Sequence, residues 1–358
     1  MKLIFSLLFV LSFVVLGFAM DIAETRSFPL VQDDDNFIKC PSSFFVTEDE
    51  LIFILDKKGS DIKIYNFKGE LVDVFGKKGQ GPDEFITPFY GTYAKPWVVF
   101  MDFGRRNFFI YKRSPQKVLE YSNKFVELGY ISSYQIMPDG DILIVGDKKN
   151  KNNKIFSISI YNHLSNTYEY LLPFEKSYGE NSVEDFLKNE KYALIGTEIY
   201  GDWLDDTIFH VWKGELKIMR LNRKSKEISY FGNKTKNYIQ PSVTPEIRKA
   251  FKERKNDLYF SLGKGMSFVR YLFTMNSGHV GVIYMGGVQK HQKLSVMLQI
   301  YTSSGSFVKE TELLRAQASN YNELYYFFRK DKNLLYVLDT ETSKDFDQFY
   351  KIHEYRIN

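Results

Sequence analysis

The sequence has few of the residues on which disulfide-bonded, zinc-bound and helical proteins depend. It contains a single Cys, Cys40, and five His. One Cys excludes an intramolecular disulfide framework and a cysteine-rich zinc module, and no two His have the spacing of a helical zinc site. Only seven of the 358 residues are Ala, the best helix former. These shortages argue against a disulfide scaffold, a zinc module and a helical bundle.

An excess of charge of one sign is also missing. Lys and Arg number 48 against 44 Asp and Glu, a formal net charge of +4. Nucleic-acid-binding proteins gather basic residues on one face. Here the densest basic stretches, 148–154 and 248–255, are short and mixed with Asn or Glu. We therefore expect no nucleic-acid partner.

Aromatic residues, in contrast, are abundant. The chain has 32 Phe, 25 Tyr and 3 Trp, 17% of its length, and 44% of its residues are hydrophobic. Aromatic side chains favour half-buried pleated surfaces. A chain this apolar is not disordered, and its charged fraction of 26% is too high for a membrane bundle. The composition predicts a mostly β protein with an ample core.

Residues 1–19 have the layout of a secretory signal peptide. Lys2 precedes an apolar run, and Gly17 and Ala19 place small residues before a cleavage point ahead of Met20 or Asp21. An uncleaved anchor is the alternative, although the run is short for a membrane span. We expect a secreted or periplasmic protein in which residues 20–358 form one domain. No later stretch reaches the length of a membrane span.

Pairs of β-like runs separated by turn residues recur along the chain. The first pair covers 52–56 and 62–72, and five similar pairs follow. A tyrosine closes the second run in five of the six units: Tyr65, Tyr111, Tyr161, Tyr301 and Tyr355. Repeats of 40 to 50 residues with several strands each are typical of propeller blades. A β-sandwich is the alternative, but it does not explain so regular a period.

The repeat predicts an all-β fold, a six-bladed β-propeller with four-stranded antiparallel blades and short helical insertions. The last unit ends after its third strand, so we expect residues 25–31 to supply its outer strand and close the ring. Thr244 and Pro245 are typical of a helix start and predict a helical insertion at about 241–255. Residues 183–191 are a weaker helical candidate.

One glycine-rich stretch carries a family resemblance. Residues 75–88 read FGKKGQGPDEFITP, and this segment resembles the signature between blades of NHL-like propellers, in particular a family of secreted bacterial six-bladed β-propellers. Gly76, Gly79 and Gly81 are expected to adopt positive φ where the chain passes between blades. No Gly-Lys-Ser/Thr follows, so the stretch is not a phosphate-binding loop. The resemblance implies the fold and transfers no catalytic residue.

Aromatic residues and arginines near the predicted inner strands are the candidate ligand-binding residues. Aromatic and Arg side chains are enriched at binding hot spots and in sugar or peptide platforms. The alternative is that these aromatics only fill the space between blades. The candidates are Trp97, Arg105, Arg106, Tyr134, Tyr200, Trp203, Arg270 and His279.

A calcium site in the channel is a weaker hypothesis. Glu198 and Asp202 lie in a predicted inner strand, and calcium prefers carboxylate oxygens. The other predicted inner strands, 89–92, 134–136 and 268–271, have almost no acidic residues. We therefore predict no cofactor and keep calcium as an alternative.

These observations favour a non-enzymatic, exported, monomeric scaffold that binds a protein, peptide or glycan partner in the cell envelope through one face. No Gly-x-Ser-x-Gly elbow is present, and no catalytic set is recognisable. The alternative is a channel-centred hydrolase or lyase that resembles the lactonase-like propellers, with or without a dependence on calcium.

Overall fold

The structure is a computed structural model that describes residues 20–33, 37–81, 83–114, 119–126, 130–173, 198–232, 235–253, 266–286, 293–317, 324–342 and 348–358. The predicted signal peptide (1–19) and the weaker helical candidate (183–191) lie outside these ranges.

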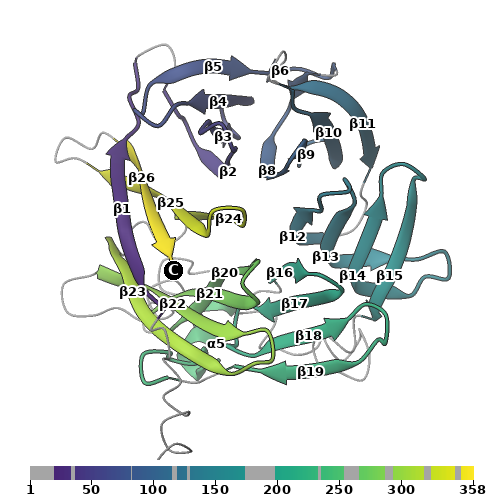
Figure 1. Cartoon of the computed structure of the whole chain (residues 1–358), viewed down its shortest axis with the longest axis vertical. Helices are drawn as coiled ribbons and strands as arrows, with labels where there is room; N and C mark the ends of the chain where they lie inside the picture. The colour runs from purple at the N-terminus through teal and green to yellow at the C-terminus, as the bar shows by residue number, and fades with distance from the viewer. Residues whose placement is uncertain are drawn as a thin grey trace, which may run out of the picture.

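Six four-stranded antiparallel sheets stand around a central axis (Figure 1). The prediction of a six-bladed β-propeller is confirmed. The blades are numbered 1 to 6, and the strands of each are given from the innermost outward. Blade 1 consists of β2 (Pro41–Val46), β3 (Ile52–Asp56), β4 (Asp61–Tyr65) and β5 (Leu71–Phe75); blade 2 of β8 (Pro88–Ala94), β9 (Trp97–Asp102), β10 (Asn107–Lys112) and β11 (Glu120–Val126); and blade 3 of β12 (Tyr130–Ile136), β13 (Ile142–Lys149), β14 (Ile155–Asn162) and β15 (Thr167–Pro173). Blade 4 consists of β16 (Ile199–Leu204), β17 (Thr207–Trp212), β18 (Ile218–Asn222) and β19 (Ile228–Phe231); blade 5 of β20 (Phe268–Met275), β21 (His279–Met285), β22 (Lys293–Thr302) and β23 (Phe307–Gln317); and blade 6 of β24 (Tyr325–Arg329), β25 (Leu334–Thr342), β26 (Gln348–Ile357) and β1 (Ile22–Pro29).

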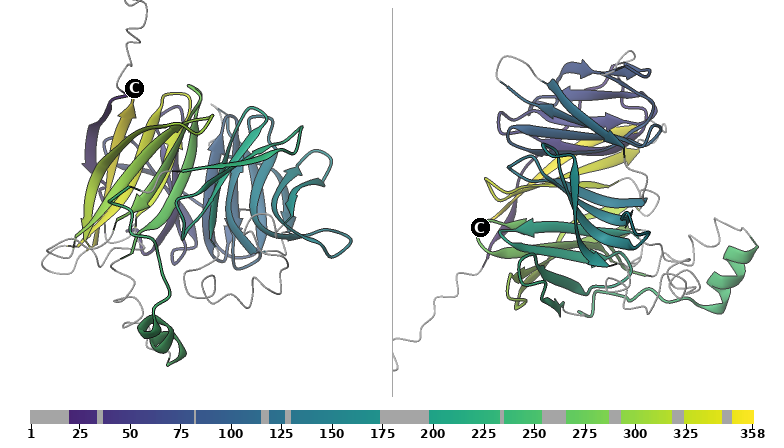
Figure 2. Two further views of the ribbon diagram at one scale, coloured as in Figure 1. Left: turned by 90° about the horizontal axis from the view of Figure 1, so that it is seen from below. Right: turned by 90° about the vertical axis from the view of Figure 1, so that its right-hand side faces the viewer.

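The six inner strands all run in the same direction along the axis. We call the face at which β2, β8, β12, β16, β20 and β24 begin the front face, and the face at which they end the rear face. Because each blade is an antiparallel meander, its outer strand returns to the front face, and the connections between successive blades lie there. The single described helix, α5 (Pro245–Lys252), belongs to such a connection and projects from the front face, opposite the C-terminus (Figure 2).

The sixth blade takes its outer strand from the beginning of the chain. β1 pairs antiparallel with β26, from Ile22 opposite Ile357 to Pro29 opposite Lys351. The contact is reinforced by Glu354, whose carboxylate accepts hydrogen bonds from Thr25 Oγ1 at 2.6 Å and from the guanidinium of Arg26 at 2.7 Å. No edge of β26 is left open to another chain.

Aromatic side chains fill the space between blades. The tyrosines that close the repeat, Tyr65, Tyr111 and Tyr301, are almost completely buried. Tyr111 contacts rings from two blades: Phe75 edge to face at 5.4 Å between centroids, and Phe100 in a tilted arrangement at 5.5 Å. Such pairs contribute about 0.5–1.5 kcal/mol each beyond the area that they bury. Much of the aromatic excess therefore serves the scaffold.

Buried aspartates at the ends of β3 and β9 attach the first two blades to the incoming chain. Asp102 accepts hydrogen bonds from the backbone N–H groups of Ile86 and Thr87 at 2.8 and 2.9 Å. Asp56 does the same for Lys39 and Cys40, at 2.7 and 3.0 Å. Each carboxylate thereby satisfies two backbone N–H groups of the segment that leads into an inner strand.

The glycine-rich stretch differs in one respect from the prediction. Gly76 has a positive φ of 84°, but Gly79 and Gly81 do not. Gly79 instead allows the close approach of Glu84: a Cβ at position 79 would lie 2.1 Å from Glu84 Oε2 and would displace that side chain. That oxygen accepts the N–H groups of Gln80 and Gly81, both at 2.8 Å, and two short strands, β6 (Lys77–Lys78) and β7 (Glu84–Phe85), pair beside it.

The helix α5 is shorter than the predicted insertion of 241–255. Thr244 is its N-cap, because its Oγ1 accepts the Ile247 N–H at 3.3 Å. Ile247 and Ala250 are buried. The helix therefore begins at Thr244 and Pro245 as the sequence predicts, and residues 254–255 of the predicted insertion lie outside the described ranges.

Candidate functional site

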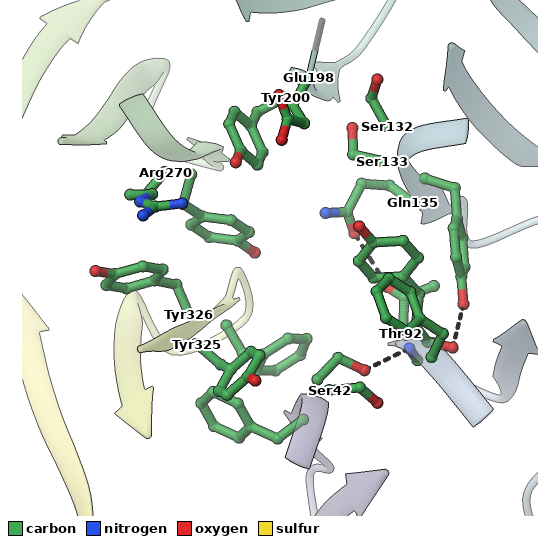
Figure 3. Close-up of a pocket in the computed structure, with 18 of the residues that line it drawn as sticks. Ser42, Thr92, Ser132, Ser133, Gln135, Glu198, Tyr200, Arg270, Tyr325 and Tyr326 are labelled. Atoms are coloured by element: carbon green, nitrogen blue, oxygen red, sulfur yellow. Dashed lines mark hydrogen bonds between the residues drawn. The ribbon is translucent and has the colours of Figure 1, made fainter. Parts of the chain in front are cut away.

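A cavity of about 320 Å³ opens into the channel at the front face (Figure 3). This front cavity has the size of a small-ligand site. Its described lining combines aromatic rings, hydroxyl groups and a few charges, and includes no His and no Cys. It consists of Ser42, Ser43, Phe44, Lys57, Phe89, Tyr90, Gly91, Thr92, Ser132, Ser133, Tyr134, Gln135, Glu198, Tyr200, Arg270, Tyr271, Leu324, Tyr325, Tyr326 and Phe327.

Four of the six inner strands carry a β-bulge where they enter this cavity. The strand register shifts across Ser42 in β2, Phe89 in β8, Ser132 in β12 and Arg270 in β20. All four bulged residues line the front cavity. A bulge adds one residue to a strand and changes the direction of its side chain, and bulges are frequent beside functional sites. The recurrence of the same distortion at one end of four blades marks this end of the channel.

Neighbouring inner strands are joined by side chains that accept backbone N–H groups. Ser43 Oγ accepts the N–H of Gly91 at 2.8 Å, and Ser133 Oγ accepts that of Gly201 at 3.2 Å. Both glycines permit close approach, since a Cβ on Gly201 would lie 2.7 Å from Val145 Cγ2. These bonds fix the spacing of the blades around the front cavity.

A polar belt crosses the channel below the front cavity. Thr92 Oγ1 donates to Gln135 Oε1 at 3.0 Å, and the Tyr271 hydroxyl oxygen accepts the Phe328 N–H at 3.3 Å. Gln135 also hydrogen-bonds Tyr271. Burial, with the charge of Asp202, raises the pKa of Tyr271, which therefore stays neutral at physiological pH. The belt separates the front cavity from a second one.

Charged groups gather at the rim of the front cavity near blade 4. Lys213 Nζ lies 2.9 Å from Glu198 Oε1, and the backbone N–H of Lys213 donates a hydrogen bond to the Glu198 backbone carbonyl at 2.8 Å. Burial lowers the pKa of Lys213, the carboxylate of Glu198 opposes that shift, and the nearby Arg270 adds to it. Arg270 lies on the wall of the cavity, whereas Tyr200 and Gln135 point toward its middle (Figure 3).

The rear cavity, of about 290 Å³, begins on the other side of the belt. Here the carboxylate of Asp202 is already used: it accepts Thr274 N–H at 2.7 Å and Lys330 Nζ at 2.9 Å. Lys330 also lies 4.1 Å from the centre of the Trp203 ring. Burial lowers the pKa of Lys330, against the effect of Asp202. Asp202 and Lys330 thus connect three blades.

The predicted ligand-binding residues fall into separate places. Tyr134, Tyr200 and Arg270 line the front cavity together with Glu198, whereas Trp203 lines the rear cavity. The Tyr134 hydroxyl donates to the Tyr90 carbonyl at 2.6 Å, so this ring also braces two blades.

Four other candidates line neither cavity, although the sequence suggested them as ligand-binding residues. Arg105 is held in blade 2, where Nε donates to Asp102 Oδ2 at 2.8 Å and the guanidinium donates to the Glu84 carbonyl. Arg106 is exposed on the same turn. Trp97 packs its ring edge against His163 at 4.8 Å, and His279 bonds Ser277 at 3.1 Å. The last two residues begin second strands and therefore lie toward the rear face.

The calcium hypothesis gains no support from the described residues. Among them, no group of three or more His, Cys, Asp or Glu is arranged to hold a metal ion. Glu198, the residue before β16, and Asp202 within it are four residues apart, about 13 Å at the usual strand rise. One lies at each cavity, so the two carboxylates cannot share an ion.

Several residues of the front cavity were not identified from the sequence. These are the bulged Ser42, Phe89 and Ser132, the belt residue Gln135, and the tyrosines Tyr325 and Tyr326. A partial signal exists, because a Ser pair occurs at the start of two inner strands: 42–43 and 132–133. Its recurrence at equivalent positions would have pointed to this end of the channel.

Comparison with known proteins supports the fold. Residues 19–128 match the model of a family described as "6-bladed beta-propeller". The resemblance predicted from the sequence is confirmed. No curated protein matches the chain significantly.

Solved propellers superpose on nearly the whole chain. A member of the DUF4221 family from Bacteroides vulgatus has 9% identity and a TM-score of 0.61, covering 95% of this chain and 99% of its own. A presumed exported protein from Bacteroides fragilis has 12% identity and a TM-score of 0.56, covering 96% of both chains. The WD40 repeats of RRP9 reach a TM-score of 0.53 at 8% identity, covering 94% of this chain and all of that one. At such identities the likeness establishes the fold alone.

Within the described ranges, no helix has the length and apolar character that a membrane crossing requires.

Proposed function

We propose that this six-bladed propeller is a non-enzymatic scaffold that binds part of a protein, peptide or glycan partner in its front cavity. The observation that carries the proposal is the set of four bulges that bring Ser42, Phe89, Ser132 and Arg270 into one cavity of ligand size. Register shifts also occur in outer strand pairs, but those of the inner strands all fall at this one end of the channel. Bulges are frequent beside functional sites.

The chemistry of the lining supports binding. Tyrosine and arginine are enriched in the residues that dominate binding energy, because they combine apolar area with hydrogen-bonding groups. Ser132 adds a buried hydroxyl that has no hydrogen-bond partner among the described residues. A buried polar group of this kind costs free energy until it is paired, and a ligand group in the cavity could pair it.

A matched pair of variants on β16 tests the proposal. Tyr200 lines the front cavity and Trp203 the rear cavity, three residues apart on the same strand. Partners captured by the wild-type protein from envelope extract would be identified and then titrated with each purified variant. We expect Tyr200→Ala to weaken binding about 30-fold or more, the effect of a hot-spot residue, and Trp203→Ala to change it less than threefold.

The proposal is wrong if folded Tyr200→Ala binds as well as the wild-type protein. Circular dichroism and the melting temperature of both variants check that each one is folded. A loss of binding confined to Trp203→Ala would move the site to the rear face.

We also propose that the protein is exported, on the basis of the signal-like composition of residues 1–19. Fractionation of the native host should find the protein outside the cytoplasm, with an N-terminus at Met20 or Asp21. A cytoplasmic protein that retains Met1 would contradict this.

A further inference from the structure

Two phenylalanines of blade 2 extend the aromatic lining of the front cavity onto the surface. Phe103 lies on the turn between β9 and β10, and 58% of it is exposed. Its ring centroid is 5.5 Å from that of Phe89, which lies 4.7 Å from Tyr90, itself 6.1 Å from Tyr134. Rings in contact thus lead from solvent into the cavity. We call the exposed Phe103 and the half-buried Phe89 the aromatic ledge.

The fold does not require a phenylalanine at position 103. The turn is held by its backbone, in which Phe103 N–H donates to the Thr87 carbonyl at 2.9 Å and Arg106 N–H to the Phe103 carbonyl at 3.3 Å. More than half of the ring remains in water. Two adjoining rings at the rim of a cavity, tilted by 43° to each other, offer apolar faces to a ligand that continues outward.

The charge next to the aromatic ledge is positive. Lys57 Nζ lies 5.8 Å from the centre of the Phe89 ring, and Arg106 is exposed on the same turn as Phe103. Neither cation forms a salt bridge within the part of the chain that the structure describes. A ligand that carries carboxylates along its length would complement both groups.

The inner strands favour a sugar chain over a peptide. A peptide commonly binds by adding a strand to an open sheet edge. Around this channel, side chains already accept N–H groups on the free edges of four inner strands: those of Gly91, Gly201, Thr274 and Phe328. The groups that remain to bind a ligand are aromatic rings, hydroxyls and amides. The rings match the apolar faces of a sugar, and the hydroxyls and amides match its many hydroxyl groups.

We propose that the ligand is an acidic oligosaccharide whose end sugar occupies the front cavity and whose following sugars lie on Phe89 and Phe103. This inference rests on the proposed function, since the end sugar uses the same cavity. Each ring of the aromatic ledge stacks on a sugar face, while Lys57 and Arg106 pair with uronate carboxylates.

Titration calorimetry with oligomers of galacturonate, glucuronate and mannuronate tests the proposal. For at least one series, we expect the acidic tetramer to bind at least tenfold more tightly than its monomer. The neutral tetrasaccharide of the parent sugar should bind at least tenfold more weakly than the acidic tetramer. Phe103→Ala should weaken tetramer binding about tenfold and leave monomer binding within twofold. Phe307→Ala, another exposed phenylalanine but in β23 of blade 5, is the matched control and should change neither.

The charged groups are tested separately. The double variant Lys57→Ala/Arg106→Ala should bind the acidic tetramer more weakly than the wild-type protein does. Its affinity should also depend less on salt concentration, because fewer charge pairs remain to be screened. Tetraglutamate is the peptide probe, and binding as tight as that of the sugar tetramer would overturn the choice of a glycan.

The outcomes separate the two proposals. If Tyr200→Ala abolishes tetramer binding but Phe103→Ala does not change it, the front cavity is the site and the aromatic ledge is not part of it. Equal binding of neutral and acidic tetramers overturns the charge argument. If none of the three uronate series binds, the glycan inference is wrong, while partner binding affected by Tyr200→Ala still supports the proposed function.

Discussion

Two adjacent arginines on one turn of blade 2 have different surroundings. The side chain of Arg105 is 13% exposed and contacts the fully buried carboxylate of Asp102, and its guanidinium carbon lies 4.7 Å from the Phe109 ring centre. Arg106 is exposed and has a positive φ of 54°. The first residue therefore belongs to the attachment between blades and the second to the surface.

Replacing each arginine in turn should show this difference. Arg105→Ala leaves the carboxylate of Asp102 buried without its cation, and we expect it to lower the free energy of unfolding by about 2–4 kcal/mol. Arg106→Ala should change it by less than about 0.5 kcal/mol. Urea unfolding followed by tryptophan fluorescence measures both, and equal effects would contradict the assignment.

His210 is a buried titratable group away from both cavities. It is 3% exposed in β17, with Nε2 2.8 Å from Met219 Sδ. Burial lowers its pKa from 6.5 to about 4. Between these values the unfolded chain binds a proton that the folded chain does not, so this residue makes stability fall as the pH drops from 6.5 to 4.

The loss from His210 over that window should be about 3 kcal/mol. Asp147 opposes it, because burial raises the pKa of that carboxyl to about 6, and the folded chain then binds the extra proton. The measurement is therefore a comparison: the pH dependence of the free energy of unfolding for the wild-type protein minus that for His210→Leu. A difference that stays flat from pH 7 to 4 would show that His210 is not held neutral.

At the scale of elements, the spacing of the inner strands depends on residues without bulk. The backbone N–H of Gly201 in β16 donates a hydrogen bond to Ser133 Oγ of the preceding blade. Val145 lies so close to Gly201 that there is no room for a side chain at position 201. The same arrangement joins Gly91 to Ser43, and a Cβ on Gly91 would lie 2.7 Å from Leu55. Two pairs of neighbouring blades are thus held at a distance that a methyl group would change.

We expect Gly201→Ala to destabilise the fold by roughly 1–3 kcal/mol through overpacking. The new methyl group would meet Val145 Cγ2 at 2.7 Å, so the penalty should fall by at least half in a Val145→Ala background. A double-mutant cycle by denaturant unfolding measures this coupling. Strictly additive effects would mean that the two side chains do not compete for the same space.

At the scale of the whole molecule, ring closure depends on the pairing of β1 with β26. Removing residues 20–32 would expose the edge of β26 and strip the Thr25 and Arg26 hydrogen bonds from Glu354. Because every blade packs between two others, the opened ring loses support on both sides of the gap.

The truncated protein should melt at least 10 °C below the full chain and associate at high concentration through its open edge. Arg26→Ala, which keeps the strand pairing, is the control and should lower the melting temperature by only a few degrees. Calorimetry and light scattering provide the two measurements. A truncated protein with an unchanged melting temperature would show that β1 is dispensable.

The sequence predicted the fold because its hydrophobic runs alternate with turns at a constant period, and it placed Tyr134, Tyr200 and Arg270 on inner strands. It could not say which end of the channel each side chain faces. Tyr200 and Trp203 look equivalent in the sequence but line opposite cavities. Bulges also interrupt the alternation of inward-facing and outward-facing side chains along a strand. The sequence pattern therefore did not predict that Ser42 and Ser132 line the front cavity. Arg105 was misplaced because the sequence does not show that Asp102 is its partner.

The two ends of the described chain meet at the rear face. Asp21 and Asn358 exchange backbone hydrogen bonds of 3.2 and 2.9 Å, whereas the front cavity opens on the opposite side. A tag, carrier protein or sensor surface attached at residue 358 therefore lies on the rear side, and the front cavity faces the solution. Immobilisation by the C-terminus should therefore leave the front cavity accessible to a ligand, whereas the rear cavity would face the support.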